Sequence, residues 1–392
     1  MPSAENQFNQ FYLERFPKTN DKTLRAWSAA DEYLLQYLQE FEFEKNIKVL
    51  IVNDQFGALT CSLSKLNPTV WTDSFLSRTA IINNLNLNNL SESSTHFVNQ
   101  TSQKLESSTK FDLVVLRVPK HNSLLKFQLT TISSHINSNT KVIAAGMSKD
   151  IHKSTLKLLE DIIGSTTTSL AKKKARLVLS TAEKKNELET NELISHYRID
   201  SLNLIIKGMP GVFSRDGLDI GARVLLNHLP ATRTGQKLID LGCGTGVLGT
   251  AAAQQNPNLE LVFCDESWLA TESAKLTFES NSEATTDSQQ DSDRVTYLTT
   301  DCLRGLENRH FDFVLCNPPF HQQNVQTLSI ANKMFKQSAE KLKDSGELRV
   351  VANRHLKYRP LLNSYFKNVE IISKDPKFVV WLAKNPKVIN RI

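Results

Sequence analysis

The four residues Asn317-Pro318-Pro319-Phe320 have the types and the order to bind a planar amine. They follow an apolar run at 311–316 that predicts a buried strand, and two prolines end that strand because neither can donate to a sheet ladder. The residue before a proline is pushed to extended geometry, which would hold the Asn317 amide at the strand exit. An amide oxygen, a free carbonyl and an adjacent aromatic ring suit a flat group that carries an amino group. A simple strand-ending turn is the alternative.

Three further predicted strands of the same half also end in polar residues or glycines. The strand at 237–241 runs into a glycine-rich turn, and glycine lets a backbone approach a ligand where any Cβ would clash. The strands at 259–264 and 295–298 are followed by acids. The carboxyl ends of parallel strands share one edge of the sheet, which is where open α/β sheets bind ligands. The expected ligand-binding edge consists of Asp240, Gly242, Gly244, Gly246, Asp265 and Asp301.

The first half of the chain repeats this pattern of elements. Residues 48–59 align with 237–248 as strand, turn and helix start. Strands that alternate with helices predict, in each half, a parallel sheet covered on both faces. Further matches are Asp73 over Asp265, Phe111-Asp112 over Phe311-Asp312, and Pro119 over Pro319. We predict a duplicated α/β domain, with chance similarity between two α/β units as the alternative.

The residues expected to do chemistry are missing from the repeat. Gly57 matches Gly246, but Arg117 stands in place of Asn317, Asn53 in place of Gly242, and Gln55 in place of Gly244. The first half is therefore predicted to be a degenerate copy without a ligand site. Such a copy would be free to bind RNA or to serve a structural role.

Composition bounds the class of protein. The chain has 392 residues, a net charge of +6 and five scattered cysteines without a C-x-x-C pair, which indicates neither a disulfide framework nor a zinc site. The N-terminus lacks the apolar segment of a signal peptide, and no run is long enough to span a membrane. We expect a cytoplasmic protein that uses no metal.

A polar stretch at 183–192 suggests a domain boundary, which gives domains 1–190 and 191–392. The densest basic run contains Lys172, Lys173 and Lys174. A solvated face is the ordinary explanation of such a run, and contacts to RNA phosphates are the sharper one. Residues 281–293 are almost all polar and read as a surface insertion.

The second half resembles the class I, S-adenosylmethionine-dependent methyltransferases, through its glycine loop, its strand-end acids and Asn317-Pro318-Pro319-Phe320. This tetrapeptide is typical of enzymes that methylate exocyclic amines. Over nearly its whole length, the chain is similar to the ribosomal RNA guanine-N2 methyltransferases, which pair two class I (Rossmann-like) methyltransferase domains, the N-terminal one degenerate. This similarity rests on segments 212–219, 317–321 and 346–355. Segments 15–17, 29–35 and 53–57 favour the member that acts on 23S rRNA, with the 16S rRNA enzyme as the alternative.

The resemblance implies roles for individual residues. The Asn317 side chain and the Pro318 carbonyl would accept the two amine hydrogens, and Phe320 would stack on the base. Phe213, Arg215 and Pro319 would lie near the substrate, with helix-turn anchoring as the alternative for Arg215. Asp240 would face the ammonium group of S-adenosylmethionine, Asp265 its ribose and Asp301 its adenine, while Gly242, Gly244 and Gly246 would border its methionine part. We expect a monomer.

Three other functions compete with this one. Gly244, Gly246 and Gly249 match the dinucleotide fingerprint, with Asp265 ~20 residues further on, but hydride transfer has no use for the Asn317 corner. Methylation of a protein glutamine or of adenine would use the same tetrapeptide. A non-catalytic ribosome-assembly factor would bind RNA through both halves and would not need an intact glycine loop.

Overall fold

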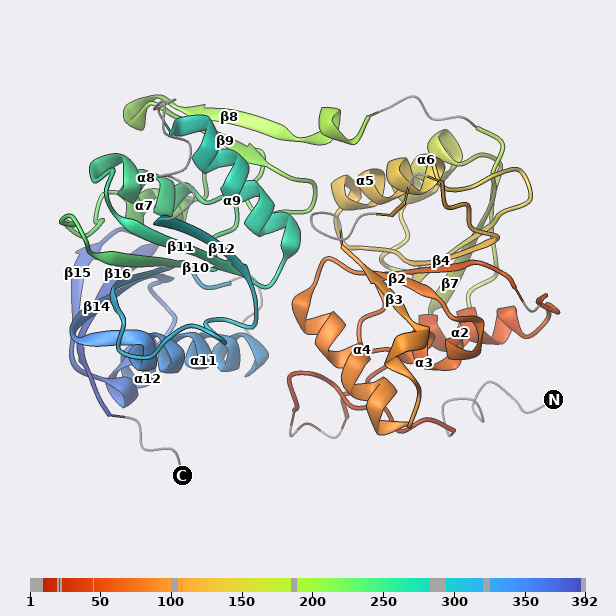
Figure 1. Ribbon diagram of the computed structural model, residues 1–392, viewed down its shortest axis with the longest axis horizontal. Helices are drawn as coiled ribbons and strands as arrows, with labels where there is room; N and C mark the ends of the chain where they lie inside the picture. The colour runs from red at the N-terminus through yellow and green to blue at the C-terminus, as the bar shows by residue number, and fades with distance from the viewer. Residues whose placement is uncertain are drawn as a thin grey trace. The chain divides into compact units, whose positions relative to one another are not determined.

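The computed structural model divides the chain into two compact units, Met1–Leu193 and Ile194–Ile392 (Figure 1). The sequence predicts a boundary between residues 190 and 191. The structure describes residues 10–388 except 20, 22, 45, 100–104, 107, 185–188, 283–293 and 320–324. The predicted insertion therefore lies mostly outside the described residues, as do Phe320 and His321. Across the described ranges, no helix combines the length and the apolar character that crossing a bilayer requires.

The first unit is built on a seven-stranded sheet. Its strands, in spatial order, are β3 (His96–Val98), β2 (Thr69–Trp71), β1 (Val49–Val52), β4 (Leu113–Arg117), β5 (Lys141–Met147), β7 (Ala175–Thr181) and β6 (Thr166–Thr168). Only β7 runs antiparallel to its neighbours. Figure 1 shows α2 (Ala29–Leu38), α3 (Ala58–Ser62) and α4 (Phe75–Leu87) on one face, and α5 (Asn122–Ser133) and α6 (Lys153–Ile162) on the other. Short 3₁₀ turns occur at Ser64–Leu66, Glu92–Ser94 and Thr190–Leu193.

The second unit repeats this sheet strand for strand. The corresponding order is β12 (Val295–Thr299), β11 (Glu260–Asp265), β10 (Lys237–Leu241), β13 (Phe311–Cys316), β14 (Leu342–Asn353), β16 (Phe378–Pro386) and β15 (Phe366–Lys374). Helices α7 (Ile220–Leu226), α8 (Val247–Gln255) and α9 (Trp268–Asn281) cover one face, and α11 (Val325–Lys341) and α12 (Tyr358–Tyr365) the other (Figure 1). A hairpin of β8 (Ser195–Ile199) and β9 (Leu204–Gly208), joined by a 3₁₀ turn at Asp200–Leu202, precedes α7 and packs on α9. The sheet order and strand directions confirm the prediction of two tandem Rossmann-like domains.

The same local devices form both sheets. The central strand β1 is buried along its whole length, as expected for a parallel strand covered on both faces. The Asp112 carboxylate accepts from the Lys48 amide at 2.8 Å, and the Asp312 carboxylate accepts from the Lys237 amide at 2.9 Å. Each of these bonds joins the starts of two neighbouring strands, β4 and β1 in the first unit and β13 and β10 in the second. The predicted match between Phe111-Asp112 and Phe311-Asp312 is therefore confirmed.

The predicted match of Asp73 with Asp265 is wrong by one residue. The Asn53 amide donates to the Trp71 carbonyl at 3.0 Å, and the Gly242 amide donates to the Cys264 carbonyl at 2.8 Å. Trp71 therefore corresponds to Cys264, and the residue that corresponds to Asp265 is Thr72. The strand register determines which residues correspond. The sequence prediction aligned one acid with another and did not take the register into account.

Candidate active site

The Asn317 amide leaves β13 in a fixed orientation. Its Nδ2 donates to Oδ2 of Asp219 at 3.1 Å. Asp219 is the N-cap of α7, and the same Oδ2 accepts from the Ala222 amide at 3.0 Å. An ionised carboxylate can only accept, so the amide nitrogen must face Asp219 and the amide oxygen must face away.

The Oδ1 atom of Asn317 is buried and has no hydrogen-bond partner within the part of the chain that the structure describes. An unsatisfied buried acceptor costs about 1–3 kcal/mol, so such atoms call for an explanation. A Cβ added to Gly221 would lie 3.3 Å from this oxygen and 2.9 Å from Oδ2 of Asp219. Glycine at position 221 therefore keeps a side chain away from the acceptor. Beside it, Pro318 is buried and Pro319 is exposed.

The glycine loop after β10 wraps the end of β11. The amides of Gly242 and Cys243 both donate to the Cys264 carbonyl, at 2.8 and 3.0 Å. The Gly244 amide donates to Oδ2 of Asp265 at 3.1 Å, and the Ser267 amide donates to its Oδ1 at the same distance. Asp265 is half-buried and thus joins the loop to the start of α9 while keeping part of its surface open.

The three predicted cofactor glycines serve two different purposes. All have positive φ, of 73°, 51° and 76° at Gly242, Gly244 and Gly246. A Cβ at Gly246 would lie 2.6 Å from the Ala274 Cα, so this glycine lets α8 pack against α9. A Cβ at Gly242 or Gly244 would meet nothing closer than 3.5 Å. These two glycines leave room that the described residues do not fill.

The first unit keeps the packing glycine and lacks the other two. A Cβ at Gly57 would lie 3.1 Å from the Ile81 Cα of α4, which repeats the constraint at Gly246. Asn53 keeps the positive φ of Gly242, at 63°, but adds a side chain. Its Nδ2 donates to the Arg117 carbonyl and to Oε1 of Gln128, both at 2.9 Å. The room that Gly242 leaves in the second unit is therefore taken up by a side chain in the first.

Asp240 is a second buried residue with an unused acceptor. It is 1% exposed, and its Oδ2 accepts from the Gly249 amide at 2.9 Å. Its Oδ1 has no partner among the described residues. Burial raises the pKa of this carboxyl to about 7. A cation placed against Oδ1 would favour the ionised form, so the residue fits the ammonium group of a cofactor. Gly249, by contrast, serves packing, since its Cβ would lie 2.5 Å from the Phe263 ring.

Asp301 has a partner that the sequence does not reveal. The carboxylate is 5% exposed and forms an ion pair with the Lys333 ammonium group of α11. Lys333 lies within an amphipathic helix where no motif marks it. The pair holds the Asp301 carboxylate in place at the edge of the sheet, where it can act as an acceptor.

The loop before α7 lies beside the glycine loop, because a Cβ at Gly244 would be 3.8 Å from the Phe213 carbonyl oxygen. Phe213 itself is 51% exposed. Arg215 anchors this loop: its Nε donates to Oγ of Ser195 at 3.1 Å, and a Cβ at Gly208 would lie 2.5 Å from the Arg215 Cβ. The structure thus shows the anchoring role of Arg215, and its contact with substrate stays a prediction.

The basic run occupies the turn before β7 in the first unit. Lys172, Lys173 and Lys174 are all exposed. The Lys173 ammonium group pairs with Glu32 of α2 at 3.2 Å, and that of Lys172 donates to Gln36 of the same helix. Two of the three predicted phosphate contacts are therefore held by side chains of their own unit.

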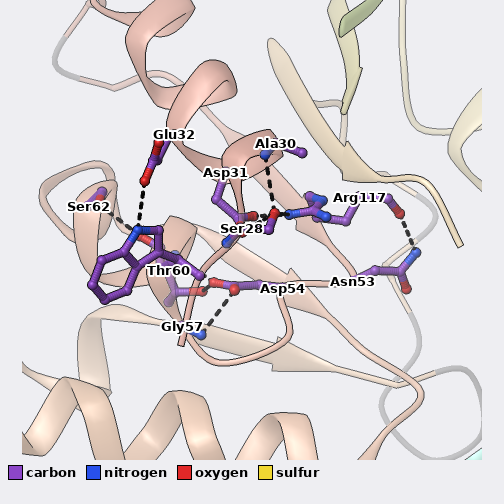
Figure 2. Close-up of polar contacts among 12 residues, drawn as sticks. Ser28, Ala30, Asp31, Glu32, Asn53, Asp54, Gly57, Thr60, Ser62 and Arg117 are labelled. Atoms are coloured by element: carbon purple, nitrogen blue, oxygen red, sulfur yellow. Dashed lines mark hydrogen bonds and ion pairs between the residues drawn. The ribbon is translucent and has the colours of Figure 1, made fainter. Parts of the chain in front are cut away.

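In the first unit, an ion pair closes the corner that corresponds to Asn317 (Figure 2). The Arg117 guanidinium donates to Oγ of Ser28 at 2.9 Å and pairs with Asp31. Ser28 is the N-cap of α2, just as Asp219 is the N-cap of α7. Both units thus link the end of a strand to the N-cap of a helix: β4 to α2 in the first unit, and β13 to α7 in the second. Arg117 has no acceptor atom, so the link in the first unit offers nothing to an amine.

Two family models match the chain, one in each unit. Residues 1–184 match a family model described as the RLMG N-terminal domain, and residues 203–382 match the methyltransferase small domain. Residues 203–382 form a methyltransferase domain. The strand-end acids and the two open glycines of this domain fit S-adenosylmethionine, the methyl donor of such enzymes.

One solved structure shares the fold over nearly the whole chain. The T. thermophilus 16S rRNA N2 G1207 methyltransferase, in complex with AdoMet and guanosine, is 20% identical. The match covers 96% of this chain and 95% of that one, with a TM-score of 0.72. M. jannaschii TYW2 in complex with AdoMet matches at 13% identity over 52% of this chain and 87% of its own, with a TM-score of 0.35. A predicted O-methyltransferase from Agrobacterium tumefaciens matches at 20% identity over 41% and 78%, with a TM-score of 0.32.

Proposed function

We propose that the protein transfers a methyl group from S-adenosylmethionine to the exocyclic N2 amine of a guanine in 23S rRNA. The observation that carries this proposal is the buried, unpartnered Oδ1 of Asn317, whose direction Asp219 sets. An exocyclic amine carries two N–H donors, so it needs two acceptors at one place. Asn317 supplies one acceptor and the Pro318 carbonyl the other.

The reaction follows from this positioning. The lone pair of the amine is delocalised into the purine ring, which makes the nitrogen a poor nucleophile. Two acceptors that hold both N–H groups turn the lone pair toward the methyl donor and stabilise the positive charge that develops on nitrogen. No proton has to leave before the transfer. S-adenosylmethionine supplies the electrophilic methyl group when bound.

The cofactor contacts are part of the same proposal. Asp240 binds the ammonium group through its free Oδ1, and Asp265 binds the ribose hydroxyls. Asp301, held by Lys333, accepts from the adenine amine. Gly242 and Gly244 give the methionine part its room, whereas Gly246 acts through helix packing.

Substrate contacts complete the proposal. Phe213, exposed beside the glycine loop, and Pro319 border the base, and Phe320 stacks on it for ~1–3 kcal/mol. The degenerate first unit (domain 1–190 by sequence) binds RNA or serves as a structural partner. The choice of 23S rRNA rests on the N-terminal segments, and the structural likeness to a 16S rRNA enzyme supports the alternative. We further propose a cytoplasmic, monomeric enzyme.

Methyl incorporation from labelled cofactor into naked 23S rRNA, naked 16S rRNA and assembled subunits tests the proposal. We expect label in 23S RNA, recovered after digestion as N2-methylguanine. Asn317→Ala should lower the rate by about 10²–10³, the usual cost of removing one positioned polar group, and leave cofactor affinity unchanged. Label in 16S RNA alone would mean that 16S rRNA is the target. Label in neither the RNAs nor the assembled subunits would overturn the proposed function.

A further inference from the structure

Five cations gather at one corner of the catalytic sheet. Arg354, Lys357 and Arg359 follow the end of β14, and Lys374 and Lys377 flank the turn between β15 and β16. All five side chains are exposed. The Arg354 amide donates to the Lys377 carbonyl at 3.0 Å, which ties the two segments together. We call this set the β14 corner.

No carboxylate neutralises the β14 corner among the described residues. Asp375, the acid of the same turn, uses Oδ1 to accept from the amides of Lys377 and Phe378, at 3.0 and 3.4 Å, and so caps the turn. Five exposed cations against this one carboxylate leave the corner with a net positive charge.

Three cations at the opposite edge of the same sheet are paired. Lys237 lies 2.6 Å from Glu260, Lys343 lies 2.9 Å from Asp312, and Arg309 lies 3.2 Å from Asp344. The amino ends of these strands thus hold ion pairs of a kind that the described residues do not form at the carboxyl end of β14.

Helix stability does not explain the charges either. Lys357 caps α12 and Arg359 lies in its first turn, which contains no acid. Positive charge at a helix N-terminus opposes the helix dipole at a cost of about 0.3–1 kcal/mol. These two cations are therefore placed where the free helix disfavours them.

The β14 corner shares an edge with the proposed catalytic residue. β14 is the parallel neighbour of β13, and Cys316 pairs with Val350. Adjacent strands lie ~4.8 Å apart, so Asn353 ends its strand on the side of the sheet where Asn317 ends the neighbouring one. A ligand that reaches Asn317 with one group can contact the corner with its flanking groups.

The first unit contains the corresponding corner, with two of its lysines held by its own helix. The Ser148 amide donates to the Lys174 carbonyl at 2.8 Å, which repeats the bond from Arg354 to Lys377. There Lys173 pairs with Glu32 of α2, and Lys172 donates to Gln36. The corresponding helix of the second unit, α7, has the sequence IGARVLL and contains no acid. Among the described residues, the duplication therefore shows lysines held by a helix at one corner and no such contact at the other.

We propose that the β14 corner binds the phosphate backbone of the RNA beside the nucleotide whose base reaches Asn317. The proposal rests on the proposed function. Phosphodiesters carry one charge per nucleotide, and a strip of unpaired lysines and arginines is the usual way to hold them. The corner positions the chain of the RNA, and Asn317 reads the amine.

The double variant Lys374→Gln/Lys377→Gln tests this proposal against a matched control, Lys336→Gln/Lys367→Gln. The control removes the same charge from exposed lysines of the same unit, on α11 and at the start of β15. Three readouts are compared for the rRNA transcript that accepts methyl groups: RNA affinity against salt concentration, kcat at saturating RNA, and cofactor affinity by calorimetry.

We expect the β14-corner variant to bind RNA about tenfold more weakly, with the slope of log K against log salt reduced by about 1.4 for two lost single-strand contacts. Its kcat at saturating RNA and its cofactor affinity should match the wild type, because the corner contacts no reacting atom. The control should match the wild type throughout. An active β14-corner variant with wild-type affinity and salt slope would overturn the inference and leave the methyltransferase function standing. Failure of the wild type to bind or methylate any RNA would overturn both.

Discussion

Asn317 Nδ2 and Asp219 Oδ2 lie 3.1 Å apart although 98 residues separate them in the chain. The carboxylate that caps α7 thus also decides which end of the Asn317 amide faces open space. A helix cap and a candidate catalytic amide share one oxygen atom. Changes at Asp219 should therefore affect activity through orientation, without any contact with substrate.

Asp219→Ser separates these two tasks. Ser caps helices as well as Asp, so the unfolding temperature should stay near that of the wild type. The serine side chain is one bond shorter, so a hydroxyl that caps the helix no longer reaches Asn317, and the orientation of Oδ1 is no longer fixed. A hydrogen bond to a charged group contributes about 1.5–3 kcal/mol, so kcat should fall about 10- to 100-fold with cofactor affinity intact. Glu370→Gln, which removes an exposed acid of β15 in the same unit, is the control; equal kcat in the two variants would contradict the orienting role.

Alanine at the two kinds of glycine should have different effects. Both Gly244→Ala and Gly246→Ala bear the cost of positive φ, about 1–2 kcal/mol. Gly246→Ala adds the collision with Ala274, worth about 1–3 kcal/mol more. Gly244→Ala meets no described atom within 3.5 Å, so it should lower cofactor affinity more than stability. Thermal unfolding and calorimetric titration with S-adenosylmethionine measure the two effects, and identical profiles for both variants would refute the division.

Arg117→Ala should destabilise the first unit without reducing cofactor affinity. It leaves Oδ1 of Asp31, a buried acid, without its cationic partner, at a cost of about 3 kcal/mol. Arg117→Ala/Asp31→Asn should recover part of the loss, because the amide removes the unpaired charge while its oxygen can still accept from Ser28. Hydrogen exchange in β4 reports on the first unit, and calorimetry reports on the cofactor. Lys18→Ala, which breaks an exposed pair with Glu14, serves as control and should leave exchange unchanged.

Cofactor binding should depend on pH through Asp240. Its pKa is raised by burial from 3.8 to about 7, so the folded protein retains a proton that the unfolded chain releases. Stability from this group is therefore present below pH ~4 and is lost as the pH rises through about 7. A cofactor ammonium group prefers the ionised carboxylate, so affinity should rise through the same range, until an α-amino group itself deprotonates near pH ~8. Asp240→Asn should remove the rise near pH 7, and a wild-type profile in that variant would exclude Asp240 as the ammonium partner.

Much of the fold can be predicted from the sequence, because the residues that end a strand form a local pattern. Apolar runs followed by Asp265, Asp301 or Asn317 indicate both the strands and the edge where they meet. The sequence does not distinguish the role of Gly246 from that of Gly244, because only the packing of α9 shows which of the two glycines faces a helix. Contacts across long separations left no local pattern either: Lys333 with Asp301 and Asp219 with Asn317 depend on how helices cover the sheet.

Each seven-stranded sheet takes all its strands from one contiguous half of the chain. No strand of the described residues is exchanged between the halves, so the first sheet has all its parts once the chain up to about Leu193 has left the ribosome. Domains built this way can fold during translation, before the rest of the chain is made. The order of synthesis therefore places the half that lacks Asn317 first, and a nascent chain whose residues up to Leu193 have emerged should already resist proteolysis.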